Sequence, residues 1–150
     1  MVKISLELSV FIHSTEDDEK VLQTLLNVVP ANLRQVLAQH LRTQILEGYY
    51  GNIIKQVKLS ISKNVATEVL KHILCSLSKV DRDILLTTLE SRVEERRARL
   101  HFRLSKQDLH LGKYVLSEGS DVVKVVASFE GVRYKELGAV LRDIGGSCDS

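Results

Sequence analysis

The chain has 150 residues, of which 44% are hydrophobic and 27% are charged, and it contains a single proline. This composition predicts one soluble globular domain with its own core, and it excludes a linker, a low-complexity tail and a membrane-spanning protein. The net charge is only +2, but residues 31–71 and residues 92–113 each carry +4, so a basic surface can form where these two blocks meet.

From the N-terminus, a strand and a helix precede a pair of strands. Residues 3–13 alternate between polar and apolar side chains, which predicts a strand with its even positions facing inward. The acidic run at residues 16–19 favours the positive end of a helix dipole, and Pro30 ends that helix. Residues 31–47 fit both a helix and a strand, and we interpret them as a short helical turn and then a strand. The next strand covers residues 53–62, with its polar side chains outward.

The second half of the chain predicts two helices, two strands and a last helix. Apolar residues at helical spacing indicate helices at residues 65–77 and 78–96. Alternation predicts a strand from Arg99 that continues through Leu111. A further strand covers residues 121–129, and a final helix ends at two glycines.

The resulting order of elements is β-α-β-β-α-α-β-β-α. Strands that follow one another in pairs favour antiparallel hairpins. The helices then cover one face of the sheet that the hairpins form. We therefore predict an α+β fold with two layers, a mostly antiparallel sheet and helices packed on one face. The expected domain covers residues 1–146, and residues 147–150 form a flexible C-terminal tail.

The strand that begins at Arg99 indicates the function most clearly. Its apolar residues, among them Phe102, share one face, so that Arg99, His101 and Arg103 share the other. A cationic face rich in hydrogen-bond donors suits a polyanion, and RNA is the obvious candidate. Only 5% of the residues are aromatic, there is no tryptophan, and Phe102 faces inward, so stacking of bases on an aromatic sheet is disfavoured.

Two segments resemble motifs of a known family. Residues 48–52, Gly-Tyr-Tyr-Gly-Asn, resemble its glycine-aromatic-glycine-asparagine motif, and residues 100–107 with the later Leu-Gly pair resemble its Arg-Leu-Asp-Lys-Gln…Gly motif. Together with the Thr-Glu-Asp at residues 15–17, these segments are similar to an archaeal family of RNA-binding proteins described as associated with the exosome. The resemblance implies a fold like that of the large-subunit ribosomal protein that binds 5S ribosomal RNA.

The chain departs from the family pattern at three positions. Ser105 stands where the family usually has aspartate, Tyr49 where it often has histidine, and Ile53 where it often has proline. These substitutions suggest a divergent member, and any role that needs the missing carboxylate or imidazole does not carry over.

The candidate RNA-binding residues combine cations with hydrogen-bonding side chains. Cations would bind phosphates, and amides would contact 2′-hydroxyls or base edges. Asn52 has a structural alternative, because asparagine beside glycine often holds a turn, and Tyr49 can pack on the core instead of a base. The predicted set is Arg103, Lys106, Gln107, Arg99, Lys113, Asn52, Lys58 and Tyr49.

Neither catalysis nor a cofactor or metal is predicted. The five histidines lack metal-ligand spacing, and the chain contains no nucleophile elbow and no phosphate-binding glycine loop. Cys75 falls in an apolar helical pattern and Cys148 lies near the C-terminus, so we expect no disulfide framework. A reducing, cytoplasmic location fits that expectation.

The predicted function is non-catalytic RNA binding by an accessory factor in RNA processing or degradation, whose partners are RNA and a processing complex. The alternative is a homodimeric protein–protein interaction module with no nucleic-acid role. Val122 and Val126 lie on the open face beside Lys124 and Ser128, and two such faces could pack together. Arg103 would then be buried in the dimer instead of being free for phosphate.

Overall fold

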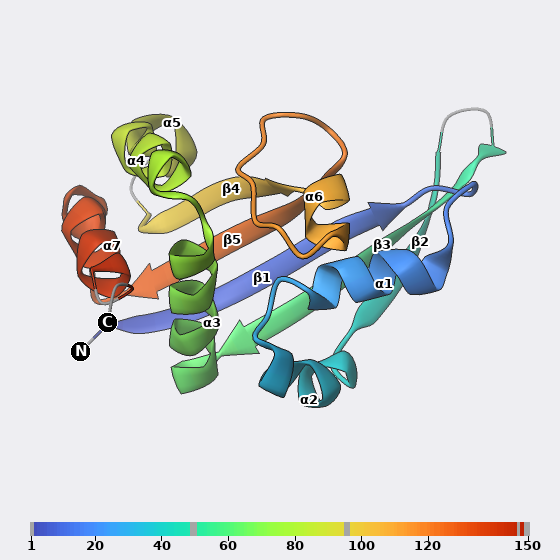
Figure 1. The fold of residues 1–150 in the computed structure, drawn as a ribbon, viewed down its shortest axis with the longest axis horizontal. Coiled ribbons are helices and arrows are strands. Elements are labelled where there is room, and N and C mark those ends of the chain that lie inside the picture. The colour runs from blue at the N-terminus through green and yellow to red at the C-terminus, as the bar shows by residue number, and fades with distance from the viewer. Residues whose placement is uncertain (1, 49–50, 95–96, 147, 149–150) are drawn as a thin grey trace.

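The computed structural model describes residues 2–48, 51–94, 97–146 and 148. In these residues, five strands form one antiparallel sheet in the order β2-β3-β1-β5-β4, and the helices lie on one face of it (Figure 1). The predicted two-layer α+β fold is therefore confirmed. The strands are β1 (Lys3–Ile12), β2 (Arg42–Glu47), β3 (Ile53–Ser62), β4 (Arg99–Ser105) and β5 (Val122–Glu130).

One hydrophobic core fills the space between the sheet and the helices. Strands contribute every second residue, so Leu8 of β1, Leu59 of β3 and Val125 of β5 are fully buried. Phe102 of β4 faces the same core, as its position in the sequence pattern predicts. The helices are α1 (Asp18–Leu26), α2 (Arg34–Ala38), α3 (Lys63–Ser76), α4 (Lys79–Thr87), α5 (Leu89–Arg92), α6 (Lys106–His110) and α7 (Leu137–Gly145), with 3-10 turns η1 (Ala31–Leu33) and η3 (Tyr134–Glu136).

No helix in the described part of the chain is long and apolar enough to cross a membrane.

Two predicted elements differ in the structure. The continuation of the fourth strand to Leu111 is wrong, because the Ser105 hydroxyl accepts a hydrogen bond from the backbone N–H of Asp108 and starts α6 instead. The helix predicted over residues 78–96 is two shorter helices, α4 and α5. At the break, the Thr88 hydroxyl donates to the backbone carbonyl of Ile84, a local hydrogen bond that competes with regular helix.

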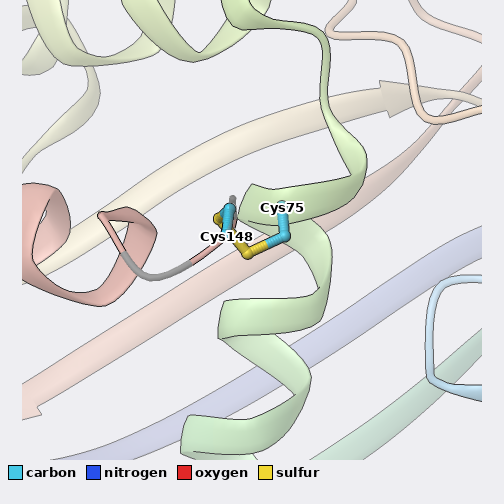
Figure 2. The surroundings of a disulfide bond; sticks show 2 residues. All are labelled: Cys75 and Cys148. Atoms are coloured by element: carbon cyan, nitrogen blue, oxygen red, sulfur yellow. A yellow bond between two sulfur atoms is a disulfide. The ribbon is translucent and has the colours of Figure 1, made fainter. Parts of the chain in front are cut away.

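A disulfide bond joins Cys75 in α3 to Cys148 beyond α7 (Figure 2). The expectation of no disulfide is therefore wrong. Leu137 and Leu141 anchor α7 in the core, and the chain after it returns to α3, so the two Cα atoms lie 5.2 Å apart. The cysteines no longer support a reducing compartment, and the cytoplasmic location and the domain boundary at residue 146 stay predictions.

Candidate nucleic-acid interface

One row of mostly cationic side chains crosses the open face of the sheet. The register of the five strands aligns one residue from each, in the order Arg42, Lys58, Ser9, Lys124 and Arg103. Neighbouring strands lie about 4.8 Å apart, so the backbone positions of this row span about 19 Å. We call these five residues the cationic row.

The cations of the central and β4-side strands face away from the core because they alternate with buried residues. Lys124 stands between two fully buried valines of β5, and Arg103 stands between Phe102 and Leu104, which face the core. The side chains of Arg42, Lys124 and Arg103 are exposed, and Lys58 is half-buried. A sheet with one buried and one solvated face produces this alternation of apolar and charged residues.

Most of the charge of the cationic row is not neutralised within the protein. Among the residues that the structure describes, Arg42 and Lys124 form no ion pair, and the guanidinium of Arg103 makes a single weak hydrogen bond of 3.4 Å to the carbonyl oxygen of Gly119. Lys58 Nζ lies 3.5 Å from Glu7 Oε1, a solvent-exposed pair that is easily exchanged for another anion. The row therefore offers several cations to a polyanion.

Beyond Arg103, the cationic row opens into a hollow of about 500 Å³ at the β4 edge. Arg92 of α5 lines this hollow, and its Nη2 donates a 2.5 Å hydrogen bond to Glu118. His101 also lines it, with Nε2 2.9 Å from Glu94 Oε1. This hydrogen bond holds the pKa of Glu94 below its ordinary value. The hollow thus continues the open face around the edge of the sheet, and Arg92 and His101 are each held there by a glutamate.

Three of the predicted RNA-binding residues lie on the open face. Arg103 and Lys58 belong to the cationic row itself. Arg99 lies four residues before Arg103 on the same strand and points to the same side. The structure therefore brings these three side chains onto one surface, as the sequence pattern predicts.

Other predicted residues lie elsewhere. Gln107 and Lys113 are exposed, but they belong to α6 and the segment after it, which pack beside α1 in the helical layer (Figure 1). Asn52 is exposed in the β2–β3 connection, where its carbonyl oxygen accepts a 2.7 Å hydrogen bond from the N–H of Gly48. This contact fits the structural alternative, a turn-holding residue. Tyr49 lies outside the described residues.

Lys106 is not available to RNA. Only 7% of the residue is exposed, and its Nζ donates to Glu16 Oε2 at 2.6 Å and to the carbonyl oxygen of Phe11 at 3.1 Å. Asp121 Oδ1 lies 3.3 Å from the same nitrogen. The ammonium group therefore fastens α6 to β1 and to the segment before α1. In contrast to the prediction from sequence, we leave Lys106 out of the interface.

The ion pair between Glu16 and Lys106 should stabilise the fold at neutral pH and lose this effect in acid. Burial raises the pKa of Glu16, but the hydrogen bond from Lys106 and nearby positive charge outweigh burial, so the pKa lies below its ordinary 4.5. A carboxyl group with a lowered pKa contributes stability above pH 4.5 and loses it as the pH falls through the folded-state pKa.

We therefore expect Glu16→Gln to lower the free energy of unfolding at pH 7, and this loss to shrink as the pH falls to about 3. Urea unfolding of wild type and variant, followed by circular dichroism across this range, measures the difference. A difference that stays constant with pH would show that the charge of Glu16 is not what stabilises the fold.

The predicted RNA-binding set leaves out three cations that lie at this surface: Arg42, Lys124 and the largely buried Arg92. The sequence pattern indicates that Lys124 faces outward, because it alternates with the valines of β5 in the same way as Arg103 alternates with its apolar neighbours. The position of Arg42 opposite Lys58 depends on the register of β2 against β3, which the sequence pattern does not specify. The packing of α5 against β4 places Arg92 beside the hollow, where its side chain is only 10% exposed and paired with Glu118.

Known proteins are similar to this chain in sequence or in fold. MJ0213 of Methanocaldococcus jannaschii, an uncharacterised protein, is 30% identical over 130 residues, which cover 84% of each chain. The RNA-binding protein PAB1135 of Pyrococcus abyssi is 34% identical over 125 residues, covering 81% of this chain and 78% of its own. The crystal structure of SSO0741 from Sulfolobus solfataricus matches with a TM-score of 0.77 and 26% identity, covering 95% of this chain and 98% of that one. The family model described as RNA binding matches residues 5–129, and the chain therefore belongs to this RNA-binding family.

Proposed function

We propose that the protein binds RNA on the open face of its sheet, through the cationic row and without catalysing a reaction. Membership of an RNA-binding family supports the choice of ligand. The observation that carries the choice of surface is the alignment of four cations across five strands, with little internal neutralisation. Phosphate contacts of this kind supply much of the affinity of proteins for nucleic acids.

The composition of the open face favours contacts to the RNA backbone over base stacking. Among the described strand residues, the open face carries one phenyl ring, Phe11, which is half-buried, and the imidazole of His101. Proteins that bind single strands by stacking use several aromatic side chains for successive bases. The proposed mode is therefore recognition by phosphate charge and ribose.

Replacing two cations of the row tests the proposal. We expect Arg103→Ala combined with Lys124→Ala to lower RNA affinity about tenfold to hundredfold, because two charge-assisted contacts are lost. Both side chains are exposed, so the fold should be unaffected. Fluorescence anisotropy with a labelled RNA hairpin, at physiological salt, measures the change.

The matched control removes two exposed cations from the helical layer instead. Lys71→Ala combined with Lys113→Ala changes the net charge by the same amount, and we expect less than a threefold loss of affinity. If this control weakens RNA binding as much as the row variant does, the interface is not on the open face. An unchanged affinity of the folded row variant would exclude the cationic row as the site.

We also propose an accessory role in RNA processing or degradation, with the exosome as the expected partner complex. The resemblance of residues 48–52 and 100–107 to the family described as exosome-associated supports this role. Binding of the purified protein to a purified exosome core, measured without RNA, tests the partnership. No binding at micromolar concentrations would remove the partner and leave the RNA-binding proposal unaffected.

A homodimer through the open face is disfavoured by the same charges. Packing two such faces together would bury Arg42, Lys124 and Arg103 of each copy, and none of them forms an ion pair with a described residue. Burying unpaired charges costs several kcal/mol per ion. We therefore expect the free protein to be monomeric in sedimentation at the concentrations where it binds RNA.

A further inference from the structure

A second row on the open face carries three hydroxyl groups and one cation. The strand register aligns Ser62 of β3, Ser5 of β1, Ser128 of β5 and Arg99 of β4. Ser60 lies two residues from Ser62, on the side toward the cationic row. These five residues line a shallow hollow of about 240 Å³, which we call the serine hollow.

The hydroxyl groups of the serine hollow have no partners within the described part of the protein, whereas the guanidinium of Arg99 has one, Glu94 Oε1, at 3.8 Å from Nη1. None of the four serine hydroxyls hydrogen-bonds to another described residue, and three of them are exposed. Arg99 Nε is buried and lacks an acceptor among the described atoms. Buried polar groups are nearly always satisfied in native proteins. An unpaired donor beside four free hydroxyls therefore indicates a surface built to receive hydrogen bonds from a ligand.

The chemistry of the hollow suits a neutral hydroxyl better than a second line of phosphates, because the cation that lines it, Arg99, already lies 3.8 Å from the carboxylate of Glu94. Glu7 also lines the hollow, and its carboxylate repels phosphate while accepting a hydrogen bond from a hydroxyl. Serine hydroxyls both donate and accept, as does the 2′-hydroxyl of ribose. The hollow thus complements the group that distinguishes RNA from DNA.

The serine hollow lies within reach of an RNA segment held by the cationic row. Ser5 and Ser9 are four residues apart on β1, so the two rows are about 13 Å apart, and Ser60 fills the interval between them. A segment of a few nucleotides covers this distance, with phosphates on the cations and riboses over the hydroxyls.

We propose that the serine hollow binds ribose 2′-hydroxyl groups and thereby selects RNA over DNA. This inference rests on the proposed function, because the cationic row must first hold the backbone. The row attracts the phosphates of either nucleic acid. The hollow adds affinity only where a 2′-hydroxyl is present.

Three hairpins of one sequence test the proposal: RNA, its 2′-fluoro form and its 2′-deoxy form. The 2′-fluoro hairpin keeps the A-form shape of RNA and removes the hydroxyl donor, so it separates shape from hydroxyl contact. We expect wild-type protein to bind RNA at least tenfold more tightly than either analogue. Ser5→Ala combined with Ser60→Ala and Ser128→Ala should lower RNA affinity to that of the 2′-fluoro hairpin and leave binding of the analogues unchanged.

Equal binding of RNA and the 2′-fluoro hairpin by wild-type protein would overturn the proposal. A preference for RNA that survives in the folded serine variant would overturn it as well. These outcomes differ from a failure of the proposed function. In that case wild-type protein would bind none of the hairpins, or the variant Arg103→Ala with Lys124→Ala would bind all three as tightly as wild type does. If the row variant loses affinity equally for all three hairpins, the cationic row binds the backbone of each. The preference of the wild type for RNA then decides whether the serine hollow binds 2′-hydroxyl groups.

Discussion

Lys106→Ala is expected to lower the free energy of unfolding by about 2–4 kcal/mol. The Lys106 ammonium is almost completely buried, between Glu16, Asp121 and the carbonyl oxygen of Phe11. Removing one partner of a buried ion pair leaves the other charge uncompensated, which typically costs 3–5 kcal/mol. The effect is smaller here because Asp121 is half-exposed and can be solvated.

Urea unfolding at pH 7 measures this loss, and Lys113→Ala is the matched control. Lys113 lies seven residues further along the chain and is exposed, so its substitution should change the free energy of unfolding by less than about 0.5 kcal/mol. Lys106→Met keeps the apolar stem and removes only the charge, so a comparable loss would assign the effect to the ammonium. A fully stable Lys106→Ala protein with weakened RNA binding would instead favour the prediction made from sequence.

Removal of the disulfide should lower the free energy of unfolding by about 2–4 kcal/mol. Cys75 and Cys148 are separated by 73 residues, and a link that closes a long loop restricts the unfolded chain strongly. The bond also fastens the end of the chain after α7 to α3 (Figure 2). The measurement is urea unfolding of wild type against Cys75→Ser combined with Cys148→Ser, with no reductant present.

Reduction of the wild-type protein provides the control for the disulfide. Dithiothreitol should shift the wild-type midpoint to that of the double variant and leave the variant itself unchanged. A wild-type midpoint that does not respond to reductant, with both thiols shown to be free, would contradict a stabilising disulfide.

The fold was predictable because alternation and helical spacing are local signals. The hydrophobic positions of β1, β3 and β5 alternate along the sequence, and the structure buries them as expected. The strand from Arg99 likewise presents its arginines outward and Phe102 inward. Such patterns identify which face of a strand is solvated, and they placed Arg103, Arg99 and Lys58 on the open face.

The cationic row could not be predicted because it depends on register between strands that are distant in the sequence. Ser9 lies opposite both Lys58 and Lys124, and no local pattern aligns residues so far apart. A shift of one residue in either pairing would turn those side chains to the other face. The sequence shows two basic blocks, but it does not show which of their cations the strand register aligns.

Lys106 illustrates the opposite error. At the end of a basic strand it resembles one more surface cation, but the Ser105 cap turns the chain into α6 and buries the side chain. Its partner Glu16 is 90 residues away, and neither the acidic helix start nor the family-like Thr-Glu-Asp at residues 15–17 indicates a contact with Lys106. The disulfide likewise joins residues that are distant in the sequence. Two cysteines at long separation carry no pairing signal, so the sequence does not predict the bond.

The salt dependence of RNA binding tests the role of the cationic row most directly. Each neutralised phosphate releases counterions and contributes about 0.7–0.9 to the slope of log affinity against log salt concentration. A variant with alanine at all four cations of the row, Arg42, Lys58, Lys124 and Arg103, should therefore show a slope shallower than wild type by about 3. The same slope in a folded variant would contradict phosphate binding on the open face.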